Sequence, residues 1–539
     1  MSYLDVPRLH FAGTFSANPS TVNNTHANFN PKVTHPVPAW NPMGNHAWQF
    51  LNCRVQSAVG ASGQISADPI IGADVLSPDQ PVIAKLVDLD TDQQGVSEIW
   101  GFQVKVAVSA TDYFMGNFRV VCFNDLWGRV LNGHPDSMFS AYYQSFLDDV
   151  SWGSQISSPF LQELQSVSPA RLSIKFVVDG YQDDSSSPQF NQGRIVGTIG
   201  PAWADEPSNF VAGRALRPPA QNAALNFGYA RVDQLRQRVM VDLGNSVPTT
   251  SPAGPPPNLG TLQLAIIPSS GSTIILGAYD YTQATYQASA GIQEYPLSTA
   301  QLALLENTPL GVVQTNAPGG SNNPAVVLRE GQNGTYICAS QQVYRMNPGD
   351  VDTVELIALQ FGKAAAGQQL NLQLGNLNDT PASALTFPQS VTTGPDGRAS
   401  FPLTAANPGN PRDYIDGQVY GVTYDWTLDD DPDFPPDSGN NFVSVLVFDS
   451  FEEAPTWENI QPIMQQYAKL YPFMDSIFQL DDPTVIQQNI AAFQQVLNIP
   501  IADPRYMPVT RDMSRDKRQR ILEWLNLGAP TAKSPTAKY

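Results

Sequence analysis

The sequence is poor in charged residues, histidine and cysteine. Only 14% of its 539 residues are charged, and 49 acidic residues against 29 basic ones give a net charge of −20. An acidic surface repels phosphate backbones and anionic lipids, so we expect no binding to nucleic acid or to membranes. The three cysteines lie far apart, which argues against a disulfide framework and against a zinc site.

Several common signatures are also missing. The chain contains no G-x-x-x-x-G-K-[ST], G-x-G-x-x-G, H-E-x-x-H or G-x-S-x-G motif. Their absence argues against the common kinase, dehydrogenase, metalloprotease and hydrolase classes. The first residues, MSYLDVPRLHF, have neither the charged start nor the long apolar run of a signal peptide. We therefore expect a cytoplasmic location.

Turn-forming residues, in contrast, are plentiful, with 46 Pro and 39 Gly. Between them lie short runs rich in β-branched and aromatic residues, which are typical of strands joined by turns. The chain is too long for one ordinary core. We predict a mainly β fold with several β-sandwich modules, including an immunoglobulin-like sandwich, and a short C-terminal helical segment.

The predicted division of the chain follows these patterns and their change after residue 450. We expect an N-terminal β domain with long loops (1–215), a second β domain (216–345), an immunoglobulin-like sandwich (346–450) and a helical segment (451–539). The clearest predicted elements are strands at 100–107, 118–123, 171–178, 238–243, 262–267, 353–360 and 442–448, and helices at 159–165, 457–478, 483–497 and 514–525, with Asp482 and Ser514 as N-caps.

All five histidines (His10, His26, His35, His46 and His134) fall in the first quarter of the chain, so a histidine base or ligand must come from there. His10 lies in an apolar run, PRLHF, where it is either a hydrogen-bonded core residue or a ligand. His46 follows a turn in NPMGNHAW, where it either stabilises the loop or forms a pocket rim with Asn45 and Trp48. We predict that His10 and His46 approach one shared cleft, with Arg214 at its edge.

Acidic and aromatic residues provide further candidates. Asp88, Asp90 and Asp92 alternate as in the start of a calcium loop, but no Glu stands at the twelfth position. Loose calcium coordination is the metal interpretation that remains. A second acidic run, 429–433 with Asp437, either holds a cation or is a solvated loop. Trp100, Trp127 and Trp48 could stack on a flat ligand, or they could belong to a core.

Six segments, in the same order along the chain, resemble one family. The chain resembles the N-terminal half of the imine dimer synthase of violacein biosynthesis and of the chromopyrrolate synthases of the rebeccamycin and staurosporine pathways. The resemblance is most specific near the two ends of the chain. The matching segments are 2–24, 41–48 (NPMGNHAW), 87–92 with 99–101, 212–218 (AGRALRP), 471–474 (YPFM) and 505–511 (RYMPVTR).

The resemblance implies oxidative coupling of two imines derived from aromatic amino acids, with haem or iron as the implicated cofactor. In those synthases the second half is a ferritin-like helical domain, and the resemblance does not extend to it. A ferritin-like iron site needs Glu-x-x-His pairs on facing helices, and the helical segment here contains no histidine. We therefore expect no di-iron centre in this chain alone.

Three functional hypotheses remain. The first is an enzyme or enzyme component of secondary metabolism that acts on a small aromatic compound. His10 and His46 would then serve as base or ligand, Arg214 would pair with a substrate carboxylate, and Asp112 would join the catalytic set. The second is a non-catalytic scaffold for a separate oxidase or ferritin-like protein. The third is a sugar-binding β-sandwich that uses Trp48 and Trp127 as platforms.

Overall fold

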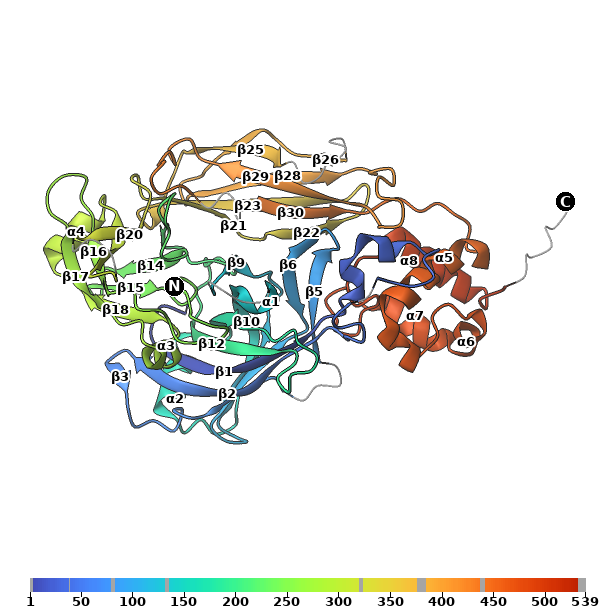
Figure 1. The fold of residues 1–539 in the computed structure, drawn as a ribbon, viewed down its shortest axis with the longest axis horizontal. Helices are drawn as coiled ribbons and strands as arrows, with labels where there is room; N and C mark the ends of the chain where they lie inside the picture. Colours follow the sequence, from blue (N-terminus) through green and yellow to red (C-terminus); the bar gives the residue numbers. More distant parts are fainter. Residues whose placement is uncertain are drawn as a thin grey trace.

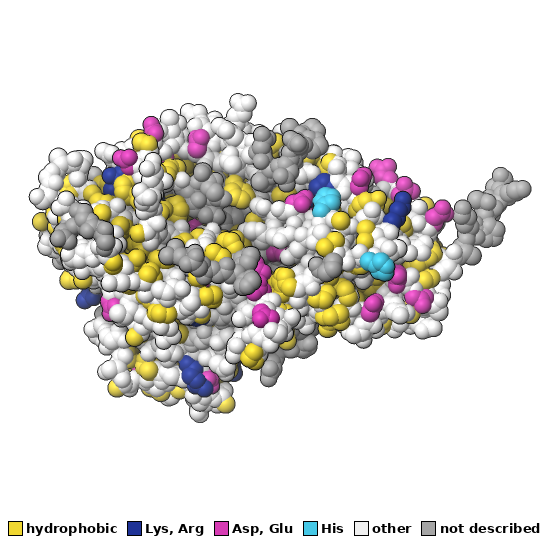
Figure 2. Space-filling model, viewed as in Figure 1, with side chains coloured by type: hydrophobic (Ala, Val, Ile, Leu, Met, Phe, Trp, Pro, Cys, Tyr) yellow, Lys and Arg dark blue, Asp and Glu magenta, His cyan; other side chains and the backbone are white. Residues whose placement is uncertain are grey.

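The structure is a computed structural model that describes residues 3–37, 39–78, 83–130, 135–318, 323–375, 384–436 and 442–531. Figure 1 shows three β-rich parts and a helical segment at the right, near the C-terminus. The predicted mainly β fold with a C-terminal helical segment is confirmed. On the face shown in Figure 2, acidic side chains gather over the helical segment.

The first domain contains a sheet that closes on itself. The order β1-β12-β11-β10-β8-β7-β4-β2 forms a ring, because β1 pairs with both β12 and β2. The remaining strands of the sheet extend outward from strands of this ring. The strands are β1 (Arg8–Asn18), β2 (Ala47–Gly60), β3 (Gly63–Ile65), β4 (Asp74–Leu76), β5 (Ala84–Asp90), β6 (Gln93–Trp100), β7 (Gln103–Ala107), β8 (Tyr113–Phe118), β9 (Asn124–Gly128), β10 (Phe139–Trp152), β11 (Leu172–Asp179) and β12 (Gln192–Pro201).

Aromatic side chains fill the interior of this ring. Trp48, Phe50 and Phe102 pack edge to face, with ring centroids 4.8 to 5.4 Å apart. Such contacts stabilise beyond the area that they bury. Short helices border the sheet, and the helix predicted at 159–165 is present. These helices are η1 (Val22–Asn24), η2 (His26–Phe29), α1 (Pro135–Met138) and α2 (Pro159–Val167).

Two predicted strands of this domain are wrong in their extent. The run 100–107 is split at Gly101, whose φ of +67° turns the chain between β6 and β7. A Cβ there would lie 2.6 Å from the Pro504 side chain, so the glycine also permits close contact with the C-terminal segment. Of the strand predicted at 118–123, Phe118 alone belongs to β8, as its last residue.

The second domain packs two four-stranded sheets around one core. The first sheet has the order β13-β14-β15-β18 and the second β17-β16-β19-β20. The elements are β13 (Arg214–Leu216), β14 (Gly228–Asp233), β15 (Arg238–Asp242), β16 (Thr261–Ile266), β17 (Ile274–Tyr279), α3 (Gln283–Ser289), β18 (Ile292–Pro296), α4 (Thr299–Leu305), β19 (Leu310–Thr315) and β20 (Ala325–Arg329).

The third part is a sandwich of two five-stranded sheets. It starts before residue 346, since β21 and β22 already belong to it. Its strands are β21 (Thr335–Ala339), β22 (Val343–Met346), β23 (Val351–Gln360), β24 (Lys363–Ala364), β25 (Gln369–Gly375), β26 (Leu385–Thr386), β27 (Ser390–Thr392), β28 (Arg398–Ala405), β29 (Gln418–Asp425) and β30 (Phe442–Val447).

The helical segment contains shorter helices than predicted. The run 457–478 ends as an α-helix before Pro472, and the run 483–497 is interrupted at Asn489. Both predicted caps are present, since Asp482 accepts from Thr484 N–H and Ser514 from Lys517 N–H. Its helices are α5 (Trp457–Leu470), η3 (Pro472–Ser476), α6 (Pro483–Gln488), α7 (Ile490–Asn498) and α8 (Arg515–Asn526).

The helices dock on the β structure through the N-terminal part of the chain. Phe29 of η2 and Ile415 share a core with the apolar faces of α5, α7 and α8. Lys469 Nζ donates to the carbonyl of Pro31. Within the described residues, no helix is long and apolar enough to cross a membrane.

Candidate functional site

An apolar pocket of about 420 Å³ lies between the loop before β2 and the C-terminal helices. We call it the His46 pocket. Its size suits a small-molecule ligand. The polar residues at its wall include Asn45, His46, Lys85, Tyr471 and Arg505. Its apolar wall includes Met464, Phe473, Met474, Ile477, Phe478, Leu480, Phe493, Val496, Leu497, Met507, Pro508, Val509, Met513 and Ile521.

The loop that carries His46 is held tightly. The Asn41 side-chain amide donates to Asn18 Oδ1 and to the Pro19 carbonyl, each at 2.7 Å. A Cβ on Gly44 would lie 2.0 Å from the Pro19 oxygen, so only glycine allows this approach. His46 itself has a φ of +60°, an uncommon conformation for a residue with a Cβ. Such conformations concentrate at functional sites.

The His46 ring is a neutral hydrogen-bond acceptor. Its Nδ1 lies 3.0 Å from the Leu86 carbonyl oxygen, so Nδ1 carries the proton and donates it. Nε2 is then unprotonated, and it is buried with no hydrogen-bond partner among the described residues. Burial lowers the pKa of His46 to about 4, so the ring stays uncharged at neutral pH. Among the described residues, Nε2 is thus an unused acceptor on a residue that lines the pocket.

Two further polar groups stand beside His46. The Lys85 ammonium donates to the Asn45 carbonyl at 2.9 Å, and burial lowers the pKa of Lys85 to about 8. The Tyr471 ring packs edge-on against the His46 ring at 5.9 Å. Its hydroxyl lies 2.6 Å from Thr510 Oγ1 and is therefore engaged. Lys85 thus supplies a positive charge beside His46 in a mainly apolar pocket.

Three of the segments on which the expected family resemblance rests meet at this pocket. Residues 41–48 contribute Asn45 and His46, residues 471–474 contribute Tyr471, and residues 505–511 contribute Arg505. The sequence pattern indicated Asn45 and His46 but not Lys85 or the helical wall. The resemblance of 471–474 and 505–511 was the available signal for that wall.

The prediction that His10, His46 and Arg214 share one cleft is wrong. His10 pairs with Ser57 and Thr198 in the sheet. The backbone N–H of His46 donates instead to the backbone carbonyl of Asn18, eight residues further along β1. Eight residues of strand span about 26 Å, too far for one small-ligand pocket. His10 is buried and its Nδ1 lies 2.8 Å from Thr198 Oγ1, so it is a core residue.

Arg214 and Asp112 have structural partners. Arg214 is 1% exposed, and its Nε lies 2.9 Å from a carboxylate oxygen of Glu330. It therefore cannot pair with a substrate carboxylate without leaving Glu330 unpaired. Asp112 Oδ2 accepts from Ser157 and from the Ser158 N–H at the start of α2, which makes it a loop anchor. Neither residue lines the His46 pocket.

The three tryptophans predicted to bind one ligand lie in different parts of the structure. Trp48 is 1% exposed inside the ring, so it cannot act as a stacking platform for a sugar. Trp127 is half-buried, and its indole N–H donates to Asn245 at 3.3 Å. Trp100 stacks under the Arg511 guanidinium, 4.5 Å from the ring centroid, and lines a different cleft.

The calcium interpretation of Asp88, Asp90 and Asp92 is wrong. Arg412 makes a bidentate ion pair with Asp90 at 2.7 and 2.9 Å and also binds Asp92. Asp88 instead accepts from Ser97 Oγ. A guanidinium thus occupies the position that a cation would need.

The second acidic run also binds arginine. Asp429 pairs with Arg217 and Asp431 with Arg329, so these two carboxylates are neither solvated nor free to hold a cation. Asp437 and His134 lie outside the described residues. His26 and His35 are exposed.

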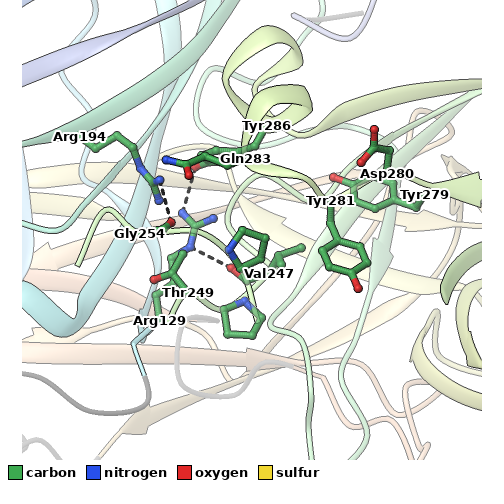
Figure 3. Close-up of a pocket in the computed structure, with 12 residues that line it drawn as sticks. Arg129, Arg194, Val247, Thr249, Gly254, Tyr279, Asp280, Tyr281, Gln283 and Tyr286 are labelled. Carbon is green, nitrogen blue, oxygen red and sulfur yellow. Dashed lines mark hydrogen bonds between the residues drawn. The ribbon is translucent and has the colours of Figure 1, made fainter. Parts of the chain in front are cut away.

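A small second pocket, shown in Figure 3, is already filled by protein groups. Its space is about 20 Å³, which is enough for water alone. In the figure Arg129 points to Tyr286 and Val247, and Arg194 to Gly254. Both arginines also bind Asp179, and they hold its pKa below the usual range although burial alone would raise it.

The cofactors implied by the resemblance can be tested against these residues. Among the described residues, no group of three or more His, Cys, Asp or Glu side chains is arranged to hold a metal ion. A single axial contact to haem requires less, namely one unprotonated imidazole nitrogen at an apolar pocket. His46 fits this requirement, because Leu86 fixes its tautomer as a carbonyl partner commonly does for metal-binding histidines.

No protein-family model matches the chain, and no curated protein matches it. Among solved structures, the S-layer protein rSbsC(31-844) is similar over 76% of this chain and 53% of that chain, with 8% sequence identity and a TM-score of 0.16. This chain thus spans about half the length of that protein. A similarity at that TM-score supports no conclusion about function.

Proposed function

We propose that this chain is an enzyme, or an enzyme component, of secondary metabolism that binds a small compound derived from an aromatic amino acid in the His46 pocket. The main support is the convergence of three family-like segments on one apolar pocket that contains an unpartnered imidazole nitrogen. Apolar pockets with a few polar groups are typical of small-molecule sites.

The chemistry of the wall suits an indole acid or a phenolic acid. The aromatic ring packs against methionine and phenylalanine side chains, which adapt to flat ligands. A ligand N–H or O–H donates to His46 Nε2, and a ligand carboxylate pairs with Lys85. Because the His46 ring is a weak base, its role at neutral pH is recognition rather than proton transfer.

The same nitrogen supports a second candidate, haem binding. His46 is the residue that would hold the haem, and a bound haem supplies oxidative chemistry for an aromatic substrate. Titration of the purified protein with haemin, followed by its visible spectrum, tests this candidate. A Soret shift that is lost in His46→Ala supports it, and an identical shift in both proteins rejects it.

The aromatic ligand can be tested with indole-3-acetic acid and its 1-methyl derivative, which lacks the N–H donor. We expect the unmethylated acid to bind about tenfold more tightly, as one lost hydrogen bond predicts. This preference should vanish in His46→Ala, and Ala492→Trp should block both ligands by filling the pocket. His35→Ala, on the surface, is the matched control. Binding that neither pocket variant changes would reject the proposal.

A further inference from the structure

A second, polar cleft of about 640 Å³ lies where the first domain, the sandwich and the C-terminal segment meet. Its wall includes Glu98 and Trp100 of β6, the loop after β12, and Arg345 of β22. Ile501 of the C-terminal segment borders it. The cleft is distinct from the His46 pocket, and the two have no lining residue in common.

Unpartnered polar atoms concentrate in this wall. Twelve buried side-chain polar atoms lack a hydrogen-bond partner in the described part of the chain, and four of them belong to residues of this cleft. Buried polar groups are almost always paired with protein or with water, so these four groups have unused hydrogen-bonding capacity in residues that line the cleft. The four atoms are Trp100 Nε1, Glu206 Oε1, Asn209 Oδ1 and Arg345 Nε. Trp100, Glu206 and Asn209 are each more than nine-tenths buried.

The charges in the wall are largely neutralised. Arg345 pairs with Glu98, and Arg398 pairs with Glu355, so the cleft contains both members of each ion pair. Arg119 binds Asp148 at 2.8 Å. Burial raises the pKa of Glu206 to about 9, which keeps this carboxyl protonated at neutral pH. A charged ligand would therefore have to compete with an existing ion pair.

The four atoms require both donors and acceptors from a ligand. Glu206 Oε2 accepts the backbone N–H of Trp203 at 3.1 Å, so the acid proton belongs on Oε1, which then donates. The indole and guanidinium N–H groups also donate, and Asn209 Oδ1 accepts. A hydroxyl group can both donate and accept, so several hydroxyls on one neutral molecule satisfy this mixed set.

We propose that this cleft binds a neutral polyhydroxylated ligand of the carbohydrate class. Such a ligand would connect the sandwich to the first domain. Its apolar ring faces would lie on Val121 and Tyr344, which share the wall with the polar groups. The proposal is independent of the function assigned to the His46 pocket.

Ligand-observed NMR with glucose, maltose, N-acetylglucosamine and myo-inositol tests the proposal on the full chain. We expect at least one of these probes to bind, and Trp100→Phe, which removes only the N–H, to weaken it about tenfold. Glu206→Leu should weaken it similarly, whereas Glu206→Gln should retain binding because the group remains neutral and polar. Trp203→Phe, on a half-exposed residue outside the wall, is the matched control.

Two results would overturn the proposal. One is the absence of binding for all four probes. The other is binding that Trp100→Phe and Glu206→Leu leave unchanged, which would place the sugar elsewhere on the surface. The indole probe of the His46 pocket should not displace the sugar, so failure of one site can be distinguished from failure of the other.

Discussion

The protonation of Glu206 can be tested without any ligand. Its side chain is 7% exposed, and the backbone N–H of Trp203 donates to it. Burial raises its pKa from an ordinary value of 4.5 to about 9. The folded chain therefore keeps a proton that the unfolded chain releases above pH 4.5. Replacement by Gln removes the titrating group and keeps its shape.

The expected effect has a definite sign and size. For a carboxyl with a raised pKa, the stabilising contribution of the bound proton is complete below the unfolded pKa and is lost as the pH rises toward 9. At pH 7 the difference from the unfolded pKa is about 2.5 pH units, worth about 3 kcal/mol. Glu206→Gln should thus match the parent near pH 4.5 and exceed its free energy of unfolding by about 3 kcal/mol at pH 7.

Urea unfolding at pH 4.5, 6 and 7.5 measures this difference, and infrared difference spectra at pH 7 should show a protonated carboxyl band that Glu206→Gln lacks. Glu452→Gln, at an exposed carboxyl, is the control and should change stability by less than about 0.5 kcal/mol at any pH. A Glu206→Gln effect that is equal at pH 4.5 and 7.5, with no carboxyl band, would show that Glu206 is ionised in the fold and would refute the reasoning.

Four other changes have expected outcomes. Arg214→Met should lower the free energy of unfolding, measured in urea, by about 3–5 kcal/mol because it leaves Glu330 unpaired. Adding Glu330→Leu should restore most of this loss, and no restoration would contradict a buried ion pair. The parent should lose about 3 kcal/mol of stability from His46 as the pH falls from 6.5 to 4, because the folded pKa is depressed, and His46→Asn should flatten the pH dependence of melting. Ser514→Ala should lower the free energy of unfolding by about 1 kcal/mol through the lost cap of α8. A chain truncated before residue 457 should expose the apolar surface around Phe29 and be less soluble in a sedimentation assay. Unchanged solubility and an unchanged melting temperature would contradict docking of the helices.

Local patterns predicted local structure well. The strand expected at 262–267 is β16 (Thr261–Ile266), and both expected helix caps accept their hydrogen bonds. Such features depend on residues a few positions apart, so their physics is contained in a short stretch of sequence. Breaks within apparently continuous runs, such as that at Gly101, depend on the approach of Pro504 from the far end of the chain.

The closure of the first sheet could not be predicted in the same way. It requires β1 to pair with both β2 and β12, and the second of these pairings spans about the whole domain. Leu9 and Phe11 belong to the core of the ring, and strand alternation turns the buried His10 side chain to the other face of the sheet. Without the register, however, nothing in the sequence showed that His10 and His46 lie near opposite ends of one strand.

The candidate site shows a similar division between local and distant information. The turn before β2 marked His46, but its partner wall comes from residues more than 400 positions later. The sequence grouped Trp48 with His46 because both follow the same turn. In a regular strand residues two apart share a face, which would have placed Trp48 beside His46. The positive φ of His46 breaks this alternation just before β2 begins at Ala47, so the imidazole meets Tyr471 while the indole enters the ring. A conformation that the sequence does not reveal thus separates a pocket residue from a core residue two positions away.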